Sequence, residues 1–133
     1  MNSHFGTIRP PAALPLGEDA RLREALRRCH PSAYYAAYQF HLTGDSTRLP
    51  TVIFGIIGRY VDSRRRARLE DPDDSLRLNE DLGLDSLTLV EIAALVEEVL
   101  PVSLSDDELT RLRTVGGIRE LIESKLRGWT PPA

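Results

Sequence analysis

One serine of this chain stands where a helix would expose it for covalent chemistry. Ser86 follows a turn over residues 81–85 in which Gly83 permits a tight backbone bend. Either Asp85 or Ser86 can cap the helix predicted over the next fifteen residues. The first N–H groups of a helix lack intrahelical partners, and the helix dipole favours an anion there. We therefore expect the Ser86 hydroxyl to be exposed where a phosphate ester is favoured, although an isolated Asp-Ser-Leu is more often just a helix cap.

The residues after Ser86 form two stripes at helical spacing. One is apolar and is expected to face the core: Leu89, Ile92, Ala93, Val96, Val99 and Leu100. The other is expected to face solvent: Leu87, Glu91, Ala94 and Glu98. By themselves, glutamates on a helix face most often only keep a protein soluble.

Residues 76–126 resemble acyl carrier proteins, small helical bundles that carry acyl chains on a covalent 4′-phosphopantetheine arm. The positions that match, with no gap between Leu78 and Val115, are Leu78, Asp81, Leu82, Gly83, Asp85, Ser86, Leu87, Glu91, Glu97, Glu98, Asp106, Asp107, Glu108, Thr114 and Val115. Two positions depart from the family pattern. Thr88 replaces an acidic residue, and Ala94 replaces a larger apolar residue, which puts recognition by generic carrier-protein enzymes in doubt.

The resemblance implies a four-helix acyl-carrier-type bundle. The segment before Leu49 lies outside the resemblance, but its apolar spacing predicts an N-terminal helical extension, so the expected fold is all-α. The resemblance also implies a non-catalytic carrier whose 4′-phosphopantetheine, derived from coenzyme A, is attached to Ser86 between Asp85 and Leu87. Acyl intermediates would be held as thioesters and shuttled between enzymes of fatty-acid, lipid or polyketide-type synthesis. The alternatives are a peptidyl or aryl carrier, and an unmodified carrier-shaped interaction module that would not accept the arm.

The implied partners are a phosphopantetheinyl transferase and acyl-synthesis or acyl-transfer enzymes with basic docking patches. Electrostatic steering of such partners speeds encounter and permits quick release. The expected docking residues are Leu87, Glu91, Ala94, Glu97, Glu98, Asp106 and Asp107. The candidate walls of a pocket for the acyl chain are Val90, Leu95, Leu104, Leu109, Leu112 and Ile118, which would be apolar in a simple core as well.

Composition and charge narrow the remaining function classes. The 133 residues, 41% hydrophobic and 28% charged, suit one domain plus an appendage. The net charge of −3 conceals +5 over residues 1–70 and −8 over residues 71–133. The arginines at 64–66 and 68 lack interleaved aromatic residues or a binding motif, so nucleic-acid binding is not predicted. The three histidines and Cys29 show no metal-ligand spacing.

No targeting or membrane segment is predicted. Residues 1–16 lack the apolar core of a secretion signal, and the longest apolar run, residues 52–57, is far below the roughly 20 residues that span a bilayer. A single cysteine excludes an intrachain disulfide. We therefore expect a cytoplasmic protein, with a monomer favoured.

The chain divides into a flexible proline-rich arm over residues 1–16, a helical extension over 17–48, the carrier domain over 49–128 and a tail over 129–133. Helices are predicted over residues 19–29, from after Pro31, with Ser32 as a plausible cap, to near Gly44, and over 51–68, with close packing at Gly55 and Gly58. The extension either folds back over the cargo channel or docking face, or mediates self-association or binding of one dedicated enzyme. The sequence leaves these two hypotheses open.

Overall fold

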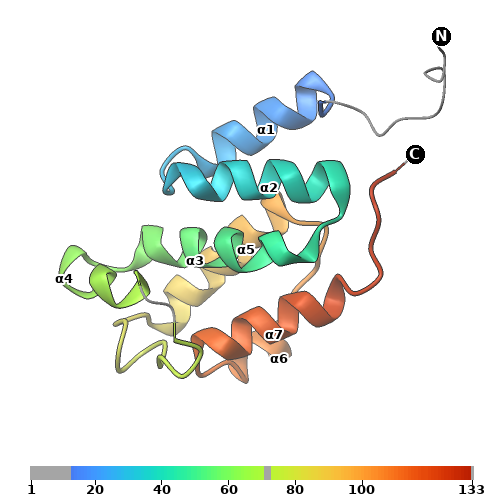
Figure 1. Cartoon of the computed structure of the whole chain (residues 1–133). Coiled ribbons are helices and arrows are strands. Elements are labelled where there is room, and N and C mark those ends of the chain that lie inside the picture. The colour runs from blue at the N-terminus through green and yellow to red at the C-terminus, as the bar shows by residue number, and fades with distance from the viewer. Residues whose placement is uncertain (1–12, 71–72, 133) are drawn as a thin grey trace, which may run out of the picture.

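The computed structural model of the chain describes residues 13–70 and 73–132, and within them the fold is all-α, as expected (Figure 1). The helices are α1 (Leu16–Leu26), α2 (Pro31–Thr43), α3 (Leu49–Tyr60), α4 (Ser63–Arg66), α5 (Ser86–Val99), α6 (Asp106–Thr110) and α7 (Val115–Lys125). Two 3₁₀ turns cover Ser46–Arg48 and Ala67–Leu69. Helices α3, α5, α6 and α7 follow the chain order expected of the bundle, and α1 and α2 form the extension. Residues 1–12, most of the predicted arm, lie outside the described residues.

Helices α1 and α2 differ slightly from their predicted bounds. The first begins and ends three residues earlier than the predicted 19–29 range. The second is capped by His30, whose ring Nδ1 accepts the Ser32 backbone N–H at 3.1 Å. Ser32 was the predicted cap, but Pro31 holds the first helical position and shifts the cap one residue before it. The second helix ends at Gly44, as predicted.

The single helix predicted over residues 51–68 was wrong. Helix α3 ends at Tyr60, where Val61 turns to an extended conformation (φ −92°, ψ 135°). Asp62 then starts α4 because its carboxylate accepts the Arg65 backbone N–H at 3.0 Å. An aspartate followed by a serine is a strong N-cap signal, and it outcompeted continuation of the helix.

The extension shares the hydrophobic core of the bundle. In Figure 1, α1 and α2 lie on one side of α3 and α5. Leu22 and Leu26 of α1 and Phe40 of α2 are buried in the same cluster as the apolar face of α3. Helices α2 and α3 approach so closely that a Cβ placed on Gly55 would lie 2.5 Å from the Ala33 Cβ. The close packing predicted at Gly55 is confirmed, whereas at Gly58 the nearest atom is at an ordinary 3.7 Å.

A histidine joins both extension helices to the end of α5. The His41 Nε2–H donates to the Val99 carbonyl at 2.5 Å, and its Nδ1 lies 3.1 Å from a carboxylate oxygen of Glu18 in α1. The carbonyls in the last turn of a helix lack intrahelical partners, so His41 satisfies one of them. Beside it, the Trp129 ring stacks on Phe40 at 4.9 Å between centroids. The residues after α7 thus pack against the extension.

No helix within the described residues has the length and apolar character needed to cross a membrane.

Candidate attachment site and docking face

Three buried leucines hold the loop that leads to Ser86. Leu78, Leu82 and Leu84 are each almost fully buried in the core. The Leu78 N–H donates to the Arg113 carbonyl, and the Leu84 N–H donates to the Leu78 carbonyl, each at 2.9 Å. The first bond ties the start of the loop to the segment before α7, and the second closes the loop on itself. Leu84, two residues before the serine, is therefore anchored in the core.

Asp81 stabilises the same loop through its carboxylate. It accepts the Arg77 backbone N–H at 2.7 Å and forms ion pairs with the side chains of Arg77 and Arg68. The Arg77 N–H and guanidinium lower the pKa of the Asp81 carboxyl. Gly83 completes the turn with φ +71°, a conformation that strains other residues. The predicted tight turn is confirmed.

Asp85, not Ser86, caps helix α5. Its carboxylate accepts the Thr88 backbone N–H at 2.8 Å, and this bond lowers the pKa of the Asp85 carboxyl. Ser86 is the first residue of α5 and is exposed. Among the hydrogen bonds of the described residues, none involves its hydroxyl. The Ser86 Oγ is therefore accessible and not engaged in the cap.

Two apolar side chains are exposed next to this serine. Leu87 is 69% exposed and Val90 is 51% exposed, whereas the apolar face of α5 is buried. Leu87 was predicted to face outward. Val90 was predicted as a pocket wall, and its exposure contradicts that. Its position four residues after Ser86 was the overlooked signal, since residues four apart share a helix face.

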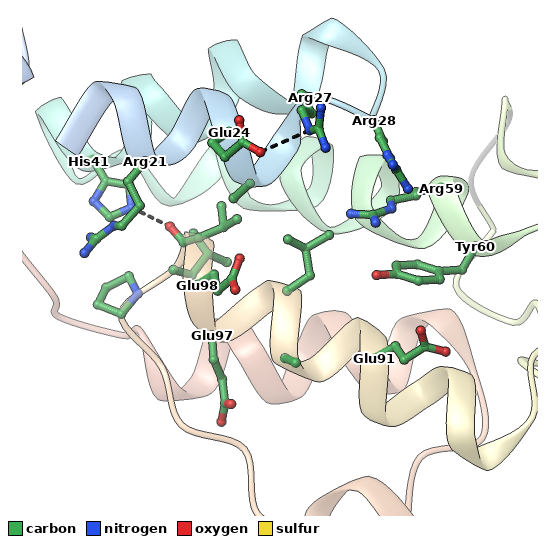
Figure 2. A pocket seen from close by; sticks show the side chains of 16 residues that line it. Arg21, Glu24, Arg27, Arg28, His41, Arg59, Tyr60, Glu91, Glu97 and Glu98 are labelled. Atoms are coloured by element: carbon green, nitrogen blue, oxygen red, sulfur yellow. Dashed lines mark hydrogen bonds and ion pairs between the residues drawn. The ribbon is translucent and has the colours of Figure 1, made fainter. Parts of the chain in front are cut away.

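The remaining predicted docking residues lie in two groups. Glu91, Ala94 and Glu98 are exposed along α5. Glu97 is also exposed, but in Figure 2 it points away from Glu91 and Glu98, and its carboxylate accepts the Leu104 N–H at 2.8 Å. It therefore also holds the segment before α6.

Asp106 and Asp107 are exposed in the first turn of α6. Ser105 caps this helix and forms a reciprocal capping box with Glu108. The Glu108 carboxylate also pairs with Lys125 of α7 at 2.9 Å. Of the three acidic residues in this helix, Asp106 and Asp107 are thus left facing solvent.

A small apolar cavity lies between α5, α6 and α7. Its volume is about 10 Å³, close to the minimum that holds one water molecule. Of the predicted pocket walls, Leu104, Leu109, Leu112 and Ile118 line it, while Leu95 faces a different groove. An acyl chain would fit there only if the helices moved apart.

That groove is larger, about 1020 Å³, and lies between α1 and α5 (Figure 2). Glu91, Ala94 and Glu98 line one side of it. The other side carries arginines of the extension region and of α3: Arg21, Arg27, Arg28 and Arg59. These arginines were not predicted as part of the docking face, because sequence spacing does not show which helix lies beside α5.

The geometry around Ser86 fits a covalent phosphodiester. A primary hydroxyl stands exposed at the start of a 14-residue helix, whose dipole favours negative charge at this end. The loop before it is rigidly held, and the neighbouring apolar side chains leave the hydroxyl open to an enzyme. In the described part of the chain, no cluster of three or more histidine, cysteine, aspartate or glutamate side chains could hold a metal ion.

Residues 65–122 match the family model described as "Phosphopantetheine attachment site", so fold and site define a phosphopantetheine-carrying domain. Curated relatives narrow the class. The chain is 32% identical over 72 residues to an acyl carrier protein of Wolinella succinogenes, covering 54% of this chain and 95% of that protein. It is 36% identical over 65 residues to an acyl carrier protein of Rickettsia bellii, and the match covers 49% of this chain and 80% of that protein. The chain belongs to the acyl carrier protein family.

A third relative, an acyl carrier protein of Coprothermobacter proteolyticus, is 45% identical over 49 residues, which cover 37% of this chain and 60% of that protein. No solved structure matches the chain significantly. Members of this family are non-catalytic carriers with covalently attached 4′-phosphopantetheine, and they interact with a phosphopantetheinyl transferase and with acyl-handling enzymes.

Proposed function

We propose that this protein carries acyl intermediates as thioesters on a 4′-phosphopantetheine arm attached to Ser86. The observation that carries the proposal is the exposed Ser86 hydroxyl at the start of α5, beside an aspartate already committed to the helix cap. Because Asp85 satisfies the Thr88 N–H by itself, Ser86 can be modified without uncapping the helix. When bound, the arm supplies a thiol that holds the acyl group.

The residues around Ser86 orient and present the arm. The phosphate ester would replace the hydroxyl proton of Ser86, while the transferase separates the pantetheine phosphate from the nucleotide part of coenzyme A. The helix dipole favours the new negative charge, and the nearby Asp85 carboxylate opposes it. Leu87 and Val90 provide exposed apolar contacts for the transferase. The carrier's own residues thus position and expose the site, and the enzyme performs the chemistry.

We propose the exposed stripe of Leu87, Glu91, Ala94 and Glu98 as the docking face for enzymes with basic patches. Its charges lie on a rigid 14-residue helix that begins at the attachment site. Asp106 and Asp107 of α6, which are also exposed, add negative charge to this docking face. Such a surface increases the rate of encounter more than it increases affinity.

The cargo and pathway belong to the same proposal. Fatty-acid, lipid or polyketide-type synthesis would supply acyl chains, and the cavity between α5, α6 and α7 would have to expand to shelter one. A peptidyl or aryl carrier is the alternative within carriers, and an unmodified carrier-shaped interaction module is the alternative outside them. We expect the protein to act as a cytoplasmic monomer. Its single cysteine, Cys29, is half-buried, and burial raises the pKa of the thiol.

The test is the intact mass of the full chain before and after incubation with coenzyme A and a broad-specificity phosphopantetheinyl transferase. Wild type should gain one phosphopantetheine, and Ser86→Ala should gain none. Ser63→Ala is the matched control, because Ser63 also follows a capping aspartate at the start of a helix, and it should be loaded like wild type. Loading of Ser86→Ala, or no loading of folded wild type, would refute the assignment.

A further inference from the structure

The groove between α1 and α5 places positive charge opposite the proposed docking stripe. Figure 2 shows Arg21 and Glu98 toward one end of the groove, and Arg28 and Glu91 toward the other. Arg59 reaches the second end from α3, and its guanidinium lies over the Tyr60 ring at 5.1 Å. Both walls therefore carry charge at both ends.

These opposite charges do not neutralise each other within the molecule. Among the ion pairs of the described residues, none joins Arg21, Arg28 or Arg59 to Glu91 or Glu98. In that same set Arg27, the residue after α1, is paired, but with Glu24 of α1 at 3.2 Å. The two walls thus remain available to charges supplied from outside.

Apolar side chains also line the groove, and two of them are small. Ala25 of α1 and Ala94 of α5 line it together with Leu95 of α5. Small side chains allow a close approach by another backbone element, as in complexes where a helix lies in a groove. Glu91 and Glu98 are seven residues apart on one helix, so they lie about 10 Å apart along its axis. Basic side chains two helical turns apart on a partner match that spacing.

We propose that this groove binds a helix of a partner protein that has one basic edge and one acidic edge. The basic edge would lie along Glu91 and Glu98, and the acidic edge along Arg21, Arg28 and Arg59. A partner with a basic edge alone would place like charge near the arginines, which opposes binding. The extension therefore selects among acyl-handling enzymes, an inference that rests on the proposed docking role of α5.

Two synthetic helical peptides of equal length provide the probe. One has a lysine edge and a glutamate edge, and the other has glutamine in place of the glutamates. Each is titrated into the isotope-labelled full chain, and binding is followed by NMR shifts in α1 and α5. The glutamine peptide is the more positive, so non-specific attraction to this acidic protein would favour it. The inference predicts instead that the peptide with both a lysine and a glutamate edge binds more tightly.

The two-edged peptide should bind wild type about three- to tenfold more tightly at low salt, the range expected for two exposed charge pairs. The preference should fall as salt screens the charges. Arg21→Glu with Arg28→Glu should reverse it. The control is Arg111→Glu with Arg127→Glu, which changes the net charge equally at exposed positions outside the groove and should keep it.

The inference would be overturned if wild type bound the two peptides equally, bound the glutamine peptide more tightly, or bound neither. It would also be overturned if the control variant reversed the preference in the same way as the Arg21 and Arg28 variant. Peptide binding does not require Ser86, so Ser86→Ala should give the same titration. Normal loading without peptide discrimination would refute this inference alone. Normal discrimination without loading would refute the proposed modification alone.

Discussion

Replacing Gly55 by alanine should destabilise the protein, because this glycine is where the extension touches the bundle most closely. The new Cβ would lie 2.5 Å from the Ala33 Cβ and 3.5 Å from its Cα. Carbon atoms in contact prefer about 3.5–4.0 Å, so α2 must move by about 1 Å or more. Ala33 is fully buried and has no flexible end that could yield.

The magnitude follows from two opposing effects. Overpacking of a core costs about 1–3 kcal/mol, whereas alanine is favoured over glycine in a helix by up to about 1 kcal/mol. The expected net loss is about 1–2 kcal/mol in the free energy of unfolding. Gly58→Ala is the matched control on the same helix, where the nearest atom is 3.7 Å away. That change should stabilise the protein by up to about 1 kcal/mol.

The assay is urea unfolding followed by circular dichroism, with a double-mutant cycle at the contact. Ala33→Gly should lower stability alone, but combined with Gly55→Ala it should restore much of the loss, since it removes the opposing methyl group. If Gly55→Ala stabilised the protein as much as Gly58→Ala, or if the cycle showed no coupling, α2 would not rest on α3 as described. The shared hydrophobic core of the extension and the bundle would then be contradicted.

Three further outcomes test other parts of the structure. His41→Ala should lower the free energy of unfolding by about 1–3 kcal/mol, because the Val99 carbonyl loses its partner; an unchanged urea midpoint would contradict that bond. Asp81 should titrate below ordinary aspartates by carboxyl NMR, because the Arg77 N–H and guanidinium favour its charged form. A lowered pKa in the folded state stabilises the protein at neutral pH, and this contribution should disappear as acid protonates Asp81; titration at the ordinary value would count against the loop geometry. Burial and a hydrogen bond to a carboxylate raise the pKa of Tyr34 to about 12. In a pH titration, the absorbance of the Tyr34 phenol should therefore change at a higher pH than that of exposed tyrosines.

The local features of the site could be predicted because they depend on neighbours in the sequence. Gly83 in its turn, Ser86 at the start of α5 and the outward stripe of Glu91, Ala94 and Glu98 all follow from turn chemistry and the 3.6-residue helical period. The sequence did not decide whether Asp85 or Ser86 caps α5, since both residue types cap helices. The three-dimensional structure chose Asp85.

Errors arose where two local rules competed. The apolar pattern favoured one helix over residues 51–68, but the cap at Asp62 ended it after Tyr60. Val90 is apolar and was therefore assigned to a pocket, yet its place on the helix exposes it next to Ser86. Residue type alone cannot separate an exposed apolar contact from a core residue.

The sequence by itself determined the class of protein, the candidate serine and the acidic stripe, because each depends on residues close together along the chain. Only the tertiary structure placed Arg21 and Arg28 across a groove from Glu91 and Glu98, about 70 residues away in sequence. It also brought His41 to the end of α5 and Ala33 against Gly55. Such pairings depend on how the buried apolar faces of different helices fit together. A helical pattern shows which face is buried, but because the hydrophobic effect is non-directional, it does not show which helix that face packs against.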